Sequence, residues 1–271
     1  MHALAVTATI RRRLLLNAVV DPDEAAVRLP AGVRPHVTPL GTVVGCCLLE
    51  IDDARPAGLP AAAGRSLLAA AHRISVEWDE PGAAAGPPTV GVYVPVRHTT
   101  SRLGAALGGR TVPGVHRRAD IALDAAGPGP LRWAVDDAGG DPAYRIRAAI
   151  AVPDDAAPTD AAPIAAEPVG AACLTADAGL SPGPHGLELV RLVAGHRRAR
   201  TVTVVECDSA FLAGFATARP APSYLAERVP VTFTSRRRSS RRAGTSRAAG
   251  PGPRSSRRPH RTAPPARAVR L

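Results

Sequence analysis

Residues 71–79, AHRISVEWD, decide the class of fold. Apolar and polar side chains alternate along this segment: Ile74, Val76 and Trp78 form the apolar set, and Arg73, Ser75 and Glu77 stand between them. A period of two residues is that of a β-strand, in which successive side chains point to opposite faces. The segment therefore predicts a strand with one apolar and one polar face.

Further strand-like segments lie on both sides of this one. The strongest are 42–52 (TVVGCCLLEID) and 90–97 (VGVYVPVR), where Pro95 restricts the second to an edge, an end or a bulge. We also expect extended or apolar strand segments over residues 3–20, 116–124, 131–136, 144–152, 187–193, 200–206 and 228–234. Strands at such short intervals predict an antiparallel barrel or sandwich rather than alternating strands and helices.

Only short helices are expected between these strands. One begins at Asp21-Pro22, because proline and acidic residues favour a helix start, and it ends at residues 29–32 (LPAG). Others are expected after Ser101, ending at Gly108-Gly109, and at residues 208–216, with Asp208 or Ser209 as cap. Helical character is also predicted for residues 169–177, and loops for 153–168 and 181–186.

The charge of the chain is concentrated at one end. The formal net charge is +11, but residues 235–271 hold 12 arginines and no acid, which leaves 22 basic and 23 acidic residues in 1–234. The body, 1–234, gives no electrostatic case for nucleic acid. The composition of 235–271 predicts a disordered tail. This tail is a solvated extension, a frame-shift product, or an arm that binds polyanions weakly without aromatic residues for stacking.

The cysteines predict a reducing, cytoplasmic environment. Cys46 and Cys47 are neighbours in an expected strand, so their side chains should point to opposite faces, and no CxxC pair occurs. Burial in an apolar strand favours inert thiols. We find no secretory leader and no apolar stretch near the ~18 residues of a membrane span.

Five segments in order carry a family resemblance: LLLNAVVDPDEAAVRLPAGVRP, VVGCCLLEIDDARPAGLP, AAHRISVEWD, GVYVPVRHTTSRLGAALGGR and PGVHRRA. Over about residues 8–234 the chain resembles the uncharacterised DUF2071 (YqjF-like) family, which is placed with the acetoacetate decarboxylase-like fold. The resemblance implies a mostly β structure with a few short helices, a closed antiparallel barrel around a central cavity. It allows a homo-oligomer but fixes no stoichiometry.

The absence of lysine limits what this resemblance implies. Acetoacetate decarboxylase forms an imine between a lysine amine and its β-keto acid, and this chain contains no lysine. At most, this chain shares with acetoacetate decarboxylase the cavity and part of its polar lining. The family pattern has an acidic residue where this chain has His98, so no role carries over to that position.

Glu77 and Arg97 are the candidate catalytic residues. A polar interior face on residues 71–79 places Glu77 inside, and a buried carboxylate needs a partner. The guanidinium of Arg97 can bind Glu77 in a bidentate way, or bind a substrate carboxylate while Glu77 acts as acid or base. The alternatives are an internal pair that only fixes the barrel, or two residues on solvated faces.

The remaining candidate substrate-binding residues are His72, Thr99, Thr100, Ser101 and His116. The three hydroxyls either support an anion together with helix-end amides or simply cap the helix that follows. His72 and His116 are expected at the pocket, although surface or structural roles are equally compatible with their positions. With His98 they match no metal-ligand spacing, so no metal is expected.

These observations favour a small-molecule cavity protein. Its ligand is expected to be a small organic acid or carbonyl compound, handled by lysine-independent chemistry. No GxGxxG or phosphate-loop motif supports a nucleotide cofactor. A non-catalytic binding or sensing module on the same scaffold stays open, as does polyanion binding through the tail.

Overall fold

A computed structural model of the chain describes residues 5–80, 87–127, 129–153, 159–160, 178–183, 186–194 and 198–236. The strands are β1 (Val6–Val20), β2 (Arg34–Pro35), β3 (Val37–Thr38), β4 (Gly41–Pro56), β5 (Arg65–Trp78), β6 (Thr89–Tyr93), β7 (Val96–Thr99), β8 (Val115–Asp124), β9 (Leu131–Asp137), β10 (Ile146–Ala151), β11 (Thr159–Asp160), β12 (Ala178–Gly183), β13 (Gly186–Ala194), β14 (Arg198–Ser209) and β15 (Arg219–Arg236). Short helices are α1 (Pro22–Ala26), α2 (Arg102–Thr111) and α4 (Ala210–Ala213), with 3-10 turns η1 (Ala61–Ala63) and η2 (Pro142–Tyr144). The mostly β class is therefore confirmed.

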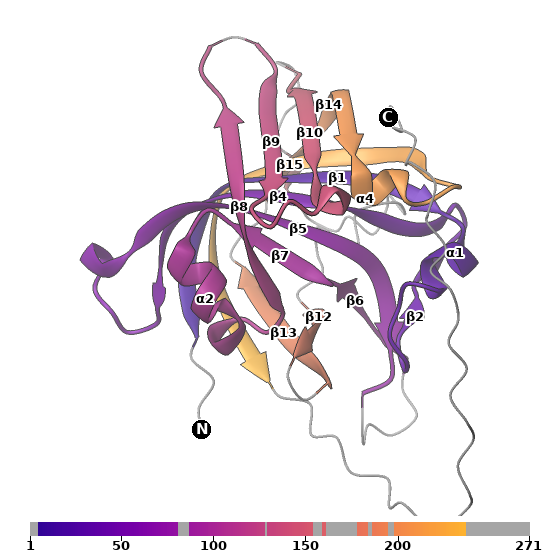
Figure 1. Cartoon of the computed structure of the whole chain (residues 1–271), viewed down its shortest axis with the longest axis horizontal. Coiled ribbons are helices and arrows are strands. Elements are labelled where there is room, and N and C mark those ends of the chain that lie inside the picture. The colour runs from indigo at the N-terminus through magenta and orange to yellow at the C-terminus, as the bar shows by residue number, and fades with distance from the viewer. Residues whose placement is uncertain are drawn as a thin grey trace, which may run out of the picture.

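The strand pairings form two rings that share four long strands. From β5 the first ring runs through β4, β1, β15, β13, β12 and β6 and back to β5. The second leaves β15 through β14, β10, β9, β8 and β7 and returns to β5. Figure 1 shows β9, β10 and β14 on one side of the long strands and β12 and β13 on the other.

Two of these pairings are parallel, so the sheet is mixed rather than wholly antiparallel. They join β6 to β12 and β7 to β8. A parallel pair needs a long connection between its strands. Helix α2 supplies it between β7 and β8, because it occupies the segment that joins them.

The shared strands are buried on both faces. Leu14, Leu16 and Cys46 belong to one hydrophobic core, while Leu15 and Cys47 belong to another. This double burial explains why residues 14–20 of β1 and 42–49 of β4 are mostly apolar, whereas a strand with one solvated face would alternate. It also gives each shared strand two chemically separate sides.

Most predicted elements are confirmed, and three details differ from the prediction. Pro95 divides the expected strand 90–97 into β6 and β7. The loop expected from residue 181 is partly strand, because Ser181 pairs with Glu188 within β12 and β13. Helix α2 does not end at Gly108-Gly109 but continues to Thr111. Gly108 is needed there for another reason: a Cβ at this position would lie 2.4 Å from the His116 ring Nδ1.

Other expectations fall outside the described residues. They are the helical segment 169–177, most of the loop 153–168 and the tail from residue 237. The domain boundary at 234 thus stays a prediction, although β15 extends to Arg236. Within the described ranges, none of the helices has the length and apolar character needed to span a lipid bilayer.

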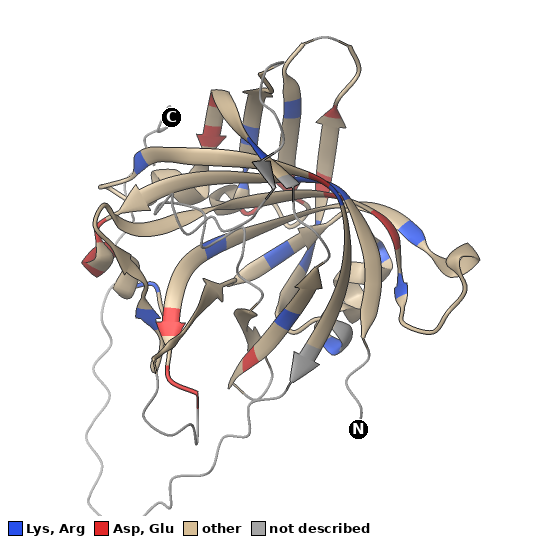
Figure 2. Cartoon of the chain, turned by 180° about the vertical axis from the view of Figure 1, so that it is seen from behind, with Lys and Arg blue, Asp and Glu red and all other residues tan. Residues whose placement is uncertain are grey.

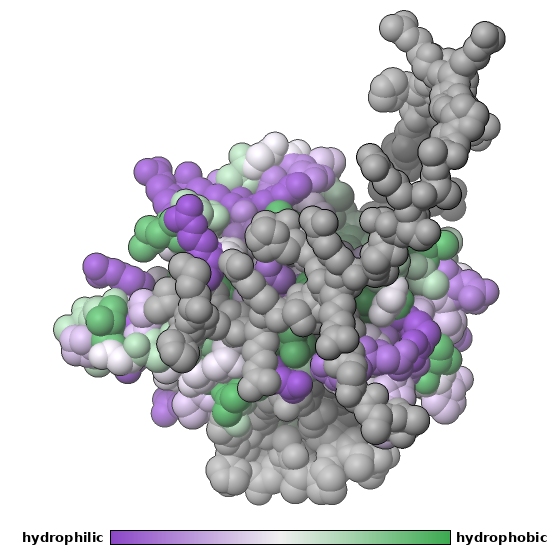
Figure 3. Space-filling view, turned by 90° about the horizontal axis from the view of Figure 1, so that it is seen from below, coloured by the Kyte–Doolittle hydropathy of each residue, from purple (hydrophilic) through white to green (hydrophobic). Residues whose placement is uncertain are grey.

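Arginines occur in the middle of strands as well as at the surface of this fold. Figure 2 shows several arginine bands midway along strands rather than only at their ends. The face seen in Figure 3 mixes apolar and polar residues among its coloured atoms. Arginines in the middle of strands lie next to buried cores. Whether their guanidinium groups already have hydrogen-bond partners in the protein therefore decides whether they can bind a ligand.

We predict that Gly45→Ala destabilises the protein by about 2–3 kcal/mol, since it overpacks a tight contact. A Cβ at Gly45 would lie 2.2 Å from the backbone oxygen of Leu16 and 3.1 Å from the Arg73 Nη2. Urea unfolding measures the change. The matched control is Gly129→Ala, since no atom lies within 4 Å of its added Cβ. Equal unfolding midpoints for the two variants would contradict the packing described for β1, β4 and β5.

Candidate functional site

A small cavity lies within the first ring of strands. Its volume is about 120 Å³, below the roughly 300–1,000 Å³ of pockets for drug-sized ligands. The lining residues are Ile10, Arg13, Cys47, Leu49, Ala71, Arg73, Val92, Val94, Arg97, Ala178, Gly179, Val190, Leu192 and Phe233. Among these described residues there are three arginines and no carboxylate, so the cavity is apolar with a cationic wall.

Arg73 is the most deeply buried of the three arginines. Its exposed fraction is 3%. Its Nη2 donates a hydrogen bond to the Asn17 side-chain oxygen, and its Nε and Nη1 have no hydrogen-bond partner in the described part of the chain. An unpaired buried polar group costs about 1–3 kcal/mol, more when it is charged. The two donors lie on different edges of the guanidinium, and an anion in the cavity would satisfy one of them.

Asn17 holds Arg73 in place and was not recognised in the sequence. Its side-chain nitrogen donates to the Pro222 carbonyl at 2.6 Å, and its backbone nitrogen donates to the Ser223 hydroxyl at 3.2 Å. These bonds orient the amide oxygen toward Arg73. The available signal was one amide in the apolar run LLLNAVV, where a buried polar residue implies a specific partner.

Arg97 lies beside Arg73 on the same face. In the register of β5 and β7, Arg97 is opposite Ala71, so Arg73 is its diagonal neighbour. Its Nη1 donates to the Pro113 carbonyl at 2.8 Å and to the Ser181 hydroxyl at 2.7 Å. Burial lowers the pKa of Arg97 to about 10, which still leaves it charged at neutral pH.

The expected pair between Glu77 and Arg97 is not formed. Glu77 lies instead 3.3 Å from the Arg34 Nε and 3.6 Å from the His36 Nδ1, and its side chain is 26% exposed. Strand β2 places Arg34 directly opposite Glu77, whereas Arg97 pairs with Ala71. Six residues along a strand span roughly 20 Å. Glu77 is therefore a peripheral ion-pair residue and does not line the cavity.

His72 lies on the opposite side of β5 from the cavity. It is fully buried, and its ring centroid lies 4.8 Å from that of Phe211 and 5.8 Å from that of His98. Burial, with a smaller contribution from the charge of His98, lowers the pKa of His72 to about 3. The reason for its position is alternation, since Ala71 and Arg73 occupy the cavity side. The expected grouping of His72 with Arg97 is wrong.

His98 belongs to this second, separate cluster. Its Nε2 lies 3.1 Å from the Asp137 carboxylate. Burial lowers the pKa of His98, while Asp137 acts in the opposite direction. The side chains of Arg97 and His98 thus enter different cores although the residues are neighbours in β7.

His116 is the neighbour of Arg97 on strand β8. The two residues are paired across β7 and β8, and the His116 Nε2 lies 2.8 Å from the Val112 carbonyl. Burial, followed by the positive charge of Arg97, lowers the pKa of His116 to about 4. His116 is therefore neutral, and it neighbours Arg97 in the sheet without belonging to the lining of the cavity.

The hydroxyls after β7 are used by the fold. Ser101 caps α2, because its hydroxyl accepts from the Gly104 nitrogen at 3.0 Å. Thr99 accepts from the Ser101 nitrogen at 3.1 Å, and Thr100 accepts from the Leu68 nitrogen at 3.1 Å. These contacts favour the capping alternative over an anion site. In the described ranges, no group of three His, Cys, Asp or Glu residues is arranged to hold a metal ion.

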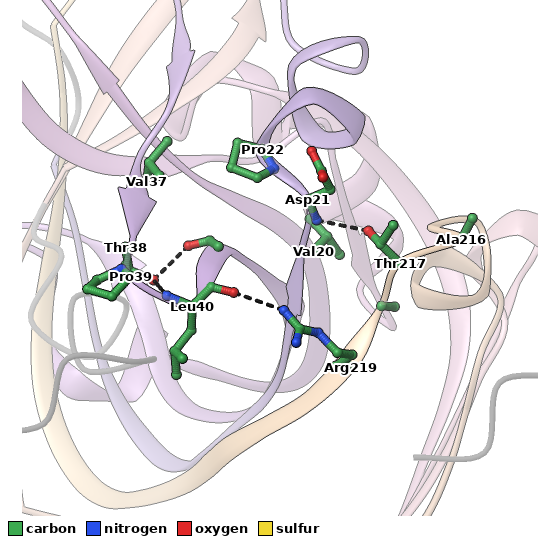
Figure 4. A pocket seen from close by; sticks show the side chains of 12 residues that line it. Val20, Asp21, Pro22, Val37, Thr38, Pro39, Leu40, Ala216, Thr217 and Arg219 are labelled. Atoms are coloured by element: carbon green, nitrogen blue, oxygen red, sulfur yellow. Dashed lines mark hydrogen bonds between the residues drawn. The ribbon is translucent and has the colours of Figure 1, made fainter.

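A larger groove of about 670 Å³ lies at the surface between α1, the β3–β4 hairpin and the start of β15. Figure 4 shows its polar atoms bonded to one another: the Arg219 guanidinium donates to the Leu40 carbonyl at 3.1 Å, and Thr217 accepts from the Asp21 nitrogen at 2.8 Å. Since these groups are already satisfied, the smaller cavity is the better candidate.

The architecture is that of the acetoacetate decarboxylase-like fold. A solved acetoacetate decarboxylase-like enzyme from Sphingomonas wittichii RW1 superimposes with a TM-score of 0.60 at 16% identity, covering 88% of this chain and 93% of the other. Acetoacetate decarboxylase from Legionella pneumophila gives 0.58 at 11%, covering 86% and 85%. The enduracididine biosynthesis enzyme MppR complexed with pyruvate gives 0.54 at 13%, covering 88% and 91%.

These likenesses establish the fold alone, because all three identities are low. No protein-family model and no curated protein matches the sequence. The resemblance to the DUF2071 family therefore stays a prediction.

We predict that His72 makes the fold acid-sensitive. Its pKa is about 3 in the folded state against 6.5 ordinarily, so the unfolded chain binds the extra proton as pH falls from 6.5 toward 3. Between these pH values the unfolding free energy of the wild type should fall as pH falls. In His72→Leu the slope of this fall should be smaller by up to about 1.4 kcal/mol per pH unit. Urea unfolding at several pH values measures this slope. Phe211→Leu is the control that alters packing but removes no titratable group. A slope unchanged in His72→Leu would contradict the assignment.

Proposed function

We propose that this protein binds a small organic acid carrying a carbonyl group in the arginine-lined cavity, and acts on it without a lysine. The supporting observation is Arg73, a buried guanidinium with two unpartnered nitrogens on the wall of a cavity whose described lining contains no acid. A carboxylate is the natural partner, since the planar guanidinium binds it in a bidentate way.

Two arginines bind different groups of such a ligand. In this proposal Arg73 donates to the carboxylate through Nη1, at the end of the guanidinium, while the charge of Arg97 lies beside the carbonyl oxygen. Cationic donors placed where negative charge develops stabilise an enolate or an alkoxide at that oxygen. Ser181 and Pro113 fix Arg97, so it needs little rearrangement when the ligand enters.

The small volume restricts the ligand further. About 120 Å³ suits an acid of few heavy atoms, and the apolar wall formed by residues such as Val92, Leu192 and Phe233 leaves little to solvate a second polar end. One fold neighbour is an acetoacetate decarboxylase and another was solved in complex with pyruvate, and both are chemically consistent with a small oxo acid as ligand. We also infer that the first ring of strands closes as a barrel around this cavity.

Two further features remain part of the proposal. Cys46, Cys47 and Cys207 are free thiols, as a cytoplasmic protein would have.

A binding or sensing role of the same cavity is distinguished from catalysis by turnover. Consumption of a bound oxo acid, followed by NMR, identifies an enzyme.

We predict that Arg73→Gln weakens pyruvate binding roughly ten- to hundred-fold, because a hydrogen bond to a charged group contributes about 1.5–3 kcal/mol. Isothermal titration or ligand-observed NMR measures the affinity. Arg34→Gln is the matched control, since Arg34 pairs with Asp79 at the surface away from the cavity. Asn17→Asp should also weaken binding, because it supplies Arg73 with an internal carboxylate. Equal affinity for pyruvate and neutral pyruvamide would contradict the proposal.

A further inference from the structure

The two adjacent cysteines of β4 occupy different environments. Cys46 faces the core of the second ring, where its sulfur lies 3.5 Å from the Ser209 hydroxyl and burial raises its thiol pKa to about 12. Cys47 points the other way and lines the arginine cavity, with an exposed fraction of 6%. Only the second thiol is therefore placed to meet a ligand of this cavity.

Cys47 and Arg97 lie in one row across three strands. Cys47 is opposite Ala71 in the pairing of β4 with β5, and Ala71 is opposite Arg97 in the pairing of β5 with β7. Charge on the Cys47 sulfur acts on Arg97 and raises the pKa of that arginine against the effect of burial. Arg97 and Arg73 are two cations in the lining of the same cavity.

Arg73 gives an independent sign of a ligand beside this thiol. It lies two residues beyond Ala71 on the same face of β5, and its Nε and Nη1 are buried without a partner in the described ranges. An anion bound there would share the cavity with the sulfur of Cys47. The cavity thus combines an anion-binding group and a nucleophile from neighbouring strands.

We propose that Cys47 is a covalent binding site for small anionic carbonyl compounds. This inference rests on the proposed function, because it needs a carboxylate held by Arg73. The sulfur attacks the carbonyl carbon, a C–S bond forms, and the C=O double bond becomes a C–O single bond. The thiol proton goes to the carbonyl oxygen, which Arg97 stabilises while it carries negative charge. The product is a reversible hemithioketal, and no oxidant or reductant is needed.

Competitive alkylation of the full-length protein tests this directly. Iodoacetate carries a carboxylate and iodoacetamide is its neutral isostere; each transfers its carbon to sulfur with loss of iodide. Relative to free glutathione, we expect Cys47 to prefer iodoacetate at least ten-fold, as quantified by peptide mass spectrometry. Arg73→Gln should abolish the preference, and Cys46 should stay unlabelled in the folded protein. No preference at Cys47, or faster labelling of Cys46, would overturn the inference.

NMR with pyruvate labelled with carbon-13 at its carbonyl separates this inference from the proposed function. Covalent addition moves the labelled carbon from the carbonyl region to the region of tetrahedral carbon in the wild type and in Cys46→Ser, but not in Cys47→Ser. Pyruvate that binds wild type and Cys47→Ser equally, without this signal, overturns the covalent site and leaves the proposed function intact. An absence of any pyruvate binding overturns both.

Discussion

The hydrogen bond between Asn17 and Arg73 is the interaction on which the interior depends. The partner of this buried guanidinium is a neutral amide. The described residues that line the cavity include no carboxylate that could pair with Arg73. Burying a charge without an opposite charge costs several kcal/mol. Such an arrangement is poor for stability alone, because an apolar side chain would fill the space at lower cost. It is well suited to a protein that receives its counter-charge from a ligand.

The second constraint is the strict alternation of β4, β5 and β7, whose two faces belong to different cores. It brings Cys47, Arg73 and Arg97 to the cavity. The same alternation sends Cys46, His72 and His98 into the opposite core, where burial lowers the pKa of both imidazoles and raises that of the thiol. One sheet thus separates a cationic, ligand-sized space from a closely packed one.

The strands could be predicted well from the sequence, because the alternation of apolar and polar residues and the positions of proline are visible within a few residues. The alternation also placed Cys46 and Cys47 on opposite faces. Arg97 was predicted in the pocket only as the partner of Glu77. The partner of Glu77 was wrong, since it depends on the register of β2 against β5, which no short segment encodes. Asn17 was missed for the same reason: Pro222 and Ser223 lie about two hundred residues away in sequence.

A crystal structure of the protein grown with pyruvate tests the central claim most directly. The account predicts a carboxylate oxygen about 2.7–2.9 Å from the Nη1 of Arg73, the range for charge-assisted hydrogen bonds. Asn17 should keep its bond to Nη2 in that structure. An empty cavity, or an Arg73 already paired with a carboxylate of the protein itself, would contradict it.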